Sequence, residues 1–242
     1  MDNSRFNIAV LIDGDNAQPK LIQKILEEVA KYGKATIRRI YGDWTKPQMN
    51  SWKEILNQYS FNPVQKFAYT TGKNSTDSSL IIEAMDILHG QSIDGFCIVS
   101  SDSDYTGLAK RIREEGLFVM GIGEKKTPNA FVQSCEIFTF CENLSEELVP
   151  ETTTVKKTVT KNPPAKPKLN EAIIDKAFDI SVKDNNEAYI SAIGLNIRKI
   201  DPSFDPRTFG YKSLTQLFNK LPKYEVVRNT VNGINNPLVK LK

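Results

Sequence analysis

Short apolar runs alternate with longer amphipathic stretches over the first 145 or so residues, and this alternation limits the fold more than any other feature. Runs rich in β-branched residues predict strands at residues 7–12, 35–41, 62–69, 94–100 and 118–123. Between them, apolar residues recur with helical period, for example over residues 21–29, 80–88 and 108–112. Strands and helices in strict alternation predict βαβ units, and therefore an α/β fold whose parallel sheet carries helices on both faces.

The alternation stops between residues 148 and 168, where proline, lysine and threonine replace the apolar pattern. This composition is typical of an extended basic linker. Helical periodicity returns at 169–182, 188–200 and 213–221, and two apolar strands at 225–228 and 238–241 flank the hairpin signal Asn232-Gly233. We therefore expect a domain at 1–147, a linker at 148–168 and a small winged helix-turn-helix domain at 169–242.

The two parts differ in charge. Residues 1–148 contain 16 basic and 20 acidic side chains, whereas residues 149–242 contain 16 basic and 9 acidic ones. This split favours a polyanion held by the C-terminal part, while the N-terminal part concentrates carboxylates for another purpose. The three cysteines show no C-x-x-C spacing and no apolar run is long enough for a membrane helix, so we expect a cytoplasmic protein without a membrane partner.

Acidic residues follow two of the predicted strands. Asp13 comes directly after the first strand, Asp102 and Asp104 follow the fourth, and Asp77 lies near the start of a predicted helix. If the two strands are neighbours, these carboxylates meet at one edge of the sheet. Like charges this close raise each other's pKa unless a cation neutralises them, and Mg²⁺ or Mn²⁺ suits such oxygen ligands and supports phosphodiester hydrolysis. The alternative for each acid alone is a helix cap or turn.

Three segments together resemble the motifs of NYN domains, members of the PIN-like nuclease superfamily. They are LIDGDN at 11–16, KNSTD at 73–77 and IVSSDSDY at 98–105, and the resemblance spans about residues 6–145. It implies a PIN-like fold in which Asp13, Asp77, Asp102 and Asp104 coordinate the metal and the attacking water, with Asn16 supporting the first acid. Asp15 is interpreted as a turn or cap residue.

Other polar and aromatic side chains near these motifs have weaker interpretations. Lys73 is a candidate phosphate contact, although a solvated lysine is the simpler reading. His89 is the only histidine and lies at a predicted helix end, where a dipole contact explains it. Tyr41, Trp44 and Trp52 could stack bases, but packing is the favoured interpretation.

The segment FDPRTFGYKSLTQLF at 204–218 resembles the signature of the LOTUS domain, also called OST-HTH, over about residues 169–242. The resemblance implies RNA binding, in some relatives of structured or guanine-rich RNA, and in others a protein partner. An ordinary solvated face explains the basic residues equally well. The candidate RNA contacts are Arg207, Lys212, Lys220, Lys223 and Arg228.

Together these features predict a metal-dependent (endo)ribonuclease whose C-terminal domain holds the RNA. One alternative is a non-catalytic RNA-binding adaptor, against which the intact set of four aspartates argues. The other is a haloacid dehalogenase-like phosphatase, because Asp13-Gly14-Asp15 imitates its D-x-D pair. That family expects Thr or Val where this chain has Ala17.

Overall fold

The computed structural model describes residues 6–67, 75–90, 92–145, 169–182, 186–231 and 234–242. Contacts between residues divide the chain into two compact units, Met1–Ser145 and Glu146–Lys242. The whole of the predicted linker at 148–168 lies outside the described residues. Among those that are described, no helix has the length and apolar character needed to cross a bilayer.

A six-stranded sheet forms the centre of the first unit. All its neighbouring strands are parallel, in the order β3-β2-β1-β4-β5-β6. The strands are β1 (Asn7–Asp13), β2 (Lys34–Gly42), β3 (Asn62–Gln65), β4 (Gly95–Val99), β5 (Phe118–Gly123) and β6 (Ile137–Phe140). The α/β fold with a parallel sheet is therefore confirmed.

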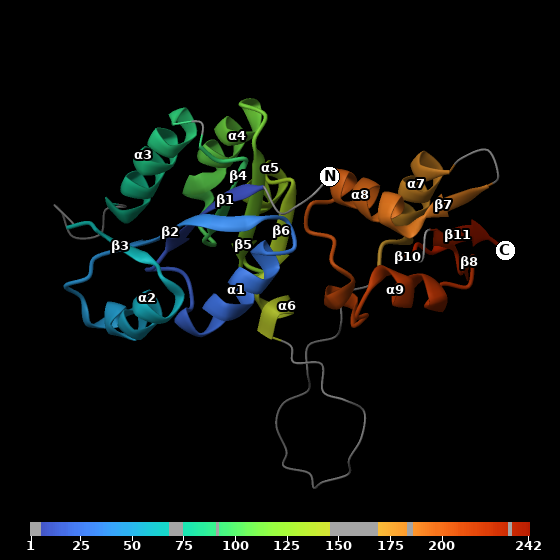
Figure 1. The fold of residues 1–242 in the computed structure, drawn as a ribbon, viewed down its shortest axis with the longest axis horizontal. Coiled ribbons are helices and arrows are strands. Elements are labelled where there is room, and N and C mark those ends of the chain that lie inside the picture. The colour runs from blue at the N-terminus through green and yellow to red at the C-terminus, as the bar shows by residue number, and fades with distance from the viewer. Residues whose placement is uncertain (1–5, 68–74, 91, 146–168, 183–185, 232–233) are drawn as a thin grey trace, which may run out of the picture. The chain divides into compact units, whose positions relative to one another are not determined.

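Helices cover both faces of this sheet (Figure 1). One face carries α1 (Ile22–Val29), α2 (Lys53–Tyr59) and α6 (Cys141–Ser145), and the other carries α3 (Ser75–His89), α4 (Thr106–Glu114) and α5 (Asn129–Ser134). Residues of β1 alternate between the two cores: Leu11 packs in the cluster under α3, α4 and α5, whereas Ile12 packs on the α1 side. By the same alternation Asp13 faces α3 and α4.

The chain reverses direction across the sheet between β1 and β4. From β1 it runs outward through β2 to β3, and from β4 it runs the opposite way through β5 to β6. Loops that leave two such strands go to opposite faces of the sheet, which opens a crevice at their carboxyl ends. The ladder between β1 and β4 pairs Ile12 with Val99, so the next residues, Asp13 and Ser100, lie side by side at the carboxyl ends of the two strands.

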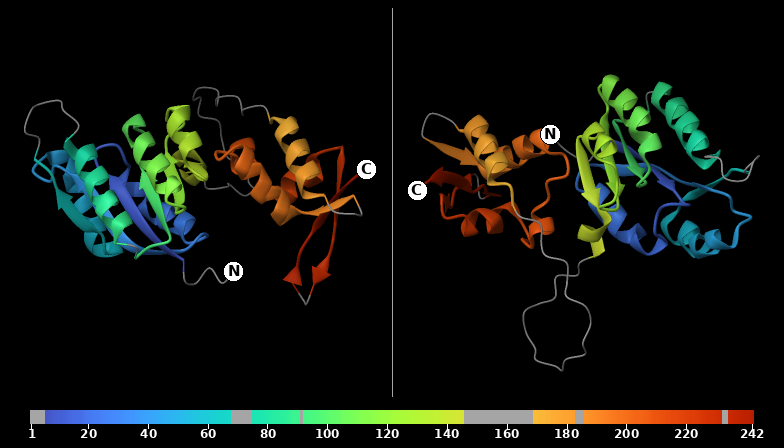
Figure 2. Two further views of the ribbon diagram at one scale, coloured as in Figure 1. Left: turned by 90° about the horizontal axis from the view of Figure 1, so that it is seen from above. Right: turned by 180° about the vertical axis from the view of Figure 1, so that it is seen from behind.

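The second unit has three helices and a three-stranded antiparallel sheet in the order β7-β11-β8. The helices are α7 (Glu171–Ser181), α8 (Ile190–Ile200) and α9 (Leu214–Lys220), and the strands are β7 (Glu187–Tyr189), β8 (Tyr224–Val227) and β11 (Leu238–Leu241). The short strands β9 (Thr230–Val231) and β10 (Ile234–Asn235) pair to form a projecting wing (Figure 2, left). The winged helix-turn-helix prediction is confirmed, although Asn232-Gly233 lies outside the described residues.

Some predicted boundaries were wrong. The helix expected at 188–200 begins at Ile190, because Glu187–Tyr189 pairs with β11 as a strand. The strand expected at 62–69 ends at Gln65, where the ladder with β2 ends. Strand β6 was not predicted, since four residues show too little periodicity to be recognised.

Candidate metal centre

Asp13 ends β1 and is fully buried, with a relative exposure of 0%. The glycine after it allows this close packing: a Cβ on Gly14 would lie 2.8 Å from the Tyr41 carbonyl oxygen, and the Gly14 N–H donates to that same oxygen. The chain therefore turns directly at the end of the strand, and the Asp13 carboxylate stays at the floor of the crevice.

Three donors surround the Asp13 carboxylate. Its Oδ2 accepts from Asn16 Nδ2 at 2.7 Å and from Ser100 Oγ at 2.9 Å, and its Oδ1 accepts from the Asp15 backbone N–H at 3.2 Å. Burial raises the pKa of Asp13, the hydrogen bonds from Asn16 and Ser100 oppose this, and the nearby charges of Asp77 and Asp15 add to it. Asn16 thus contacts the first acid.

Asp77, Asp102 and Asp104 form the acid cluster. One carboxylate oxygen from each lies within 4.8 Å of the other two, and the side chains range from buried Asp77 to exposed Asp104. Asp102 caps the 3-10 turn η4 (Ser103–Tyr105) by accepting the Asp104 N–H at 3.0 Å. This turn follows β4, and Asp77 lies in the first turn of α3. Three of the four expected ligands therefore come together, with Asp13 outside this group.

The donor set of the acid cluster fits a hard divalent cation. Burial raises the pKa of Asp77, a hydrogen bond from Tyr105 lowers it, and the charges of Asp102, Asp104 and Asp15 raise it further. Such mutual repulsion is relieved by a cation with oxygen ligands, and an all-carboxylate set suits Mg²⁺ or Mn²⁺. Asp77, Asp102 and Asp104 would hold the ion, and the side chains present fit that role.

Asp15 is interpreted from the sequence as a local turn or cap residue, but its side chain accepts hydrogen bonds from residues far along the chain. Its Oδ2 accepts from Thr76 Oγ1 at 2.9 Å and its Oδ1 accepts from Gln48 Nε2 at 3.1 Å. Asp15 therefore attaches the first turn of α3, which carries Asp77, to the loop after β1.

The aromatic candidates are packing residues for the most part. Tyr41 and Trp52 are 0% and 1% exposed, so neither can stack on a base. Trp44 is half-buried, and its Nε1 donates to the Val64 carbonyl at 3.1 Å. His89 is the last residue of α3, and Lys73 lies outside the described residues.

The basic candidates of the second unit fall into two groups. Arg207 forms an ion pair with Asp205 at 2.6 Å, and Lys223 forms one with Asp175 at 2.8 Å. Lys212 and Lys220 are exposed, and Arg228 follows β8 at the base of the wing. Two of the five are therefore engaged with carboxylates of their own unit.

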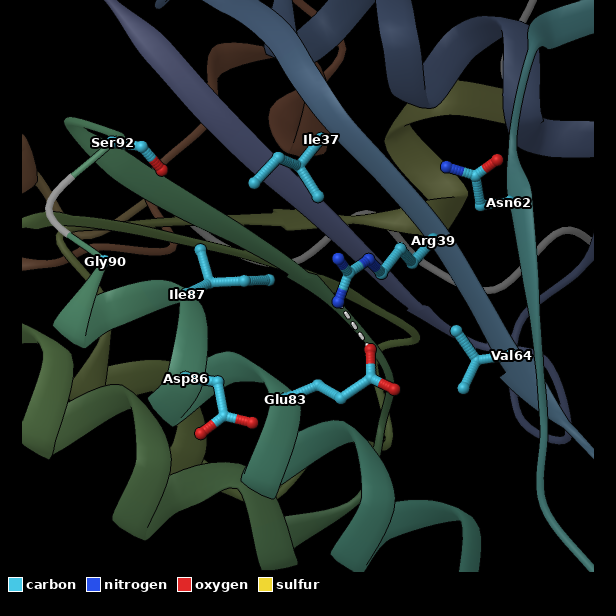
Figure 3. Close-up of a pocket in the computed structure, with 9 residues that line it drawn as sticks. All are labelled: Ile37, Arg39, Asn62, Val64, Glu83, Asp86, Ile87, Gly90 and Ser92. Carbon is cyan, nitrogen blue, oxygen red and sulfur yellow. Dashed lines mark hydrogen bonds and ion pairs between the residues drawn. The ribbon is translucent and has the colours of Figure 1, made fainter.

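A groove of about 710 Å³ lies between α3 and the strands β2 and β3, separate from the acid cluster (Figure 3). Arg39 and Glu83 form an ion pair of 2.5 Å across it. Its lining residues are Ile37, Arg39, Asn62, Val64, Glu83, Asp86, Ile87, Gly90 and Ser92. None of the acid cluster residues lines this groove.

Sequence reasoning gave no role to two side chains of the crevice. Ser100 is 2% exposed and bridges Asp13 to the Asp102 N–H, and Tyr105 is 0% exposed and donates to Asp77 Oδ1 at 2.6 Å. Both belong to the segment at 98–105. In the sequence, these two hydroxyl residues stand before and after Asp102 and Asp104. Only the fold places their hydroxyls next to carboxylates from other segments, namely Asp13 and Asp77.

Comparison with known proteins supports the two-part organisation. The NYN domain model matches residues 7–146 and the OST-HTH/LOTUS domain model matches residues 165–235. The comparison with curated proteins found no match.

Three solved structures show low similarity to the chain. A protein of unknown function from Vibrio parahaemolyticus has 18% identity and a TM-score of 0.48, over 57% of this chain and 93% of its own. An uncharacterised protein from Nitrosomonas europaea has 21% identity and a TM-score of 0.30, and the match covers 38% of this chain and 90% of that protein. A chitinase catalytic domain from Ostrinia furnacalis has 11% identity and a TM-score of 0.24, and the match covers 98% of this chain and 83% of that domain. At these TM-scores the three structures do not bear on function.

The family models cover both units, and the chain belongs to the NYN domain family, with an OST-HTH/LOTUS domain following the NYN domain.

Proposed function

We propose that the protein is a metal-dependent ribonuclease that hydrolyses RNA phosphodiester bonds at the acid cluster, while its C-terminal domain holds the RNA. The observation that carries this proposal is the meeting of Asp77, Asp102 and Asp104 within 4.8 Å, beside buried Asp13, at the carboxyl ends of two central strands. Membership of the NYN family gives this arrangement a nuclease context.

A divalent cation bound by the acid cluster would supply a Lewis acid that activates water and neutralises charge on the phosphate. The protein's own residues hold the carboxylates in place. Asn16 and Ser100 fix the Asp13 carboxylate, and Asp102 is fixed by the turn that it caps. His89 is twelve residues along α3 from Asp77, about 18 Å at the usual helical rise. The only histidine is therefore too far from the acid cluster to act as a base.

RNA binding by the C-terminal domain is supported by the OST-HTH/LOTUS match and by the basic excess of residues 149–242. Because Arg207 and Lys223 are engaged by Asp205 and Asp175, we assign the phosphate contacts to Lys212, Lys220 and Arg228. Structured or guanine-rich RNA is the first ligand class to test, and a protein partner for this domain is the alternative.

The phosphatase alternative is not supported. Its nucleophile would be Asp13, but that side chain is fully buried and its Oδ2 accepts two side-chain hydrogen bonds. A small phosphomonoester has no path to a carboxylate in this position.

The test is incubation of the purified full chain with end-labelled RNAs and DNAs in Mg²⁺, in Mn²⁺ or in EDTA, with mapping of product ends. We expect RNA cleavage that requires the metal, and the mapped ends distinguish internal cutting from trimming. RNA binding without metal-stimulated cleavage would contradict the proposal and identify a non-catalytic adaptor.

A further inference from the structure

Tyr105 is a buried tyrosine whose ring is fixed by the core and whose hydroxyl enters the metal-site crevice. The residue is 0% exposed, and its ring lies 6.3 Å from that of Phe131, centroid to centroid, within the apolar cluster under α3, α4 and α5. Tyr105 also ends η4, the turn that Asp102 caps and that contains Asp104. Its hydroxyl is thus anchored both by the core and by the turn that carries two of the acids.

The Tyr105 hydroxyl donates a hydrogen bond to Asp77, the acid of the cluster that comes from α3. Its distance to Asp77 Oδ1 is 2.6 Å, within the range for a hydroxyl bound to a charged oxygen. Burial and the nearby charges of Asp13 and Asp77 raise the pKa of Tyr105, so the hydroxyl keeps its proton and remains a donor. This hydrogen bond therefore ties α3 to the turn after β4.

The geometry points to Tyr105 as the positioning residue of the acid cluster: its hydroxyl holds the Asp77 carboxylate in the orientation that lets it share one divalent cation with Asp102 and Asp104. Asp77 is the one member of the cluster that does not belong to the segment after β4, so its position depends on a link between elements. This inference rests on the proposed function, because it assumes that the cluster binds a cation.

Tyr41 provides a matched comparison within the same unit. It is also 0% exposed, and its hydroxyl also interacts with a carboxylate of α3, that of Glu83, at 3.0 Å. Glu83, however, forms its ion pair with Arg39 in the separate groove (Figure 3). Tyr41→Phe and Tyr105→Phe each remove one hydroxyl donor from a carboxylate of α3 and keep the aromatic ring.

The experiment compares the full-length wild type, Tyr105→Phe and Tyr41→Phe by three measurements: Mn²⁺ affinity by electron paramagnetic resonance, melting temperature in EDTA, and kcat and KM on one RNA. We expect Tyr105→Phe to weaken Mn²⁺ binding about 10–100-fold, the usual effect of losing a partner of a metal ligand. Its kcat at limiting Mn²⁺ falls, KM for RNA is unchanged, and higher Mn²⁺ restores part of the rate. Tyr41→Phe should keep wild-type Mn²⁺ affinity.

Equal Mn²⁺ affinity in Tyr105→Phe and the wild type would overturn the inference, whatever the change in melting temperature, since a purely structural hydroxyl alters stability alone. Failure of the wild type to bind Mn²⁺ would also overturn it. If the wild type binds Mn²⁺ but does not cleave RNA, the proposed function fails, whereas weaker Mn²⁺ binding by Tyr105→Phe would still support the positioning role.

Discussion

The Ser100 hydroxyl donates to Asp13 Oδ2 at 2.9 Å and so joins the carboxyl ends of the two central strands. Ser100 Oγ in turn accepts the Asp102 backbone N–H at 3.1 Å. One small side chain therefore connects the buried acid of β1 to the segment that begins the acid cluster.

We expect Ser100→Ala to destabilise the N-terminal unit by about 1–3 kcal/mol, because it leaves a buried carboxylate with one donor fewer. Urea unfolding of the full chain measures this change. Ser51→Ala, at an exposed position, is the control and should alter stability by less than about 0.5 kcal/mol. Equal stability of Ser100→Ala and the wild type would show that the link between Ser100 and Asp13 is not a stabilising one.

The contribution of Asp13 and Asp77 to stability without metal should fall as the pH rises through the acid range. The pKa values of Asp13 and Asp77 are raised above the ordinary value of 3.8, so their contribution is fully present below that value and is lost as the pH passes through the raised values. Mn²⁺ should reverse the loss at neutral pH, because binding to the folded state adds stability. Melting curves in EDTA and in Mn²⁺ from pH 3.5 to 7.5 measure both effects.

Asp77→Asn should separate repulsion from metal binding. The amide removes one of the clustered charges but can still accept from Tyr105, so we expect the melting temperature in EDTA at pH 7 to rise by about 2–4 °C, the shift for roughly 1 kcal/mol. Stabilisation by Mn²⁺ should disappear in the same variant. A drop in melting temperature, with Mn²⁺ stabilisation retained, would identify Asp77 as a structural cap.

Lys220 and Lys223 should differ in their effect on RNA affinity. Lys223 is paired with Asp175 at 2.8 Å, whereas the described residues give Lys220 no ion-pair partner. Lys220→Gln should weaken binding of a structured RNA and reduce the slope of log affinity against log salt by about one, as expected for one lost phosphate contact. Fluorescence anisotropy at several salt concentrations tests this. A larger loss for Lys223→Gln would reverse our assignment.

Removal of residues 149–242 should weaken RNA binding but leave slow metal-dependent cleavage, since the acid cluster lies wholly within the first unit. A single-turnover assay with residues 1–148 measures the remaining rate of cleavage. No cleavage by a folded truncated chain, at RNA concentrations that compensate for weak binding, would mean that the second unit contributes to the reaction itself.

Much of this organisation was predictable from the sequence. Long apolar strands and amphipathic helices specify the parallel sheet, and the position of Asp13, Asp102 and Asp104 after two strands predicts where carboxylates gather. Short elements were not predictable: β6 has four residues, and β7 becomes a strand only because β11 pairs with it. The roles of Ser100 and Tyr105 depend on contacts across 87 and 28 residues of sequence, which no local pattern encodes.

Cleavage by Asp102→Asn tests the central claim most directly. The variant loses one charge of the acid cluster yet keeps an acceptor for the Asp104 N–H, so the fold should persist while the rate of Mg²⁺-dependent RNA cleavage falls about 10³-fold or more. Asp86→Asn, an exposed change on α3 outside the cluster, should cleave at the wild-type rate, and EDTA should abolish cleavage in both the wild type and Asp86→Asn. Wild-type cleavage by Asp102→Asn, or cleavage that persists in EDTA, would contradict the account.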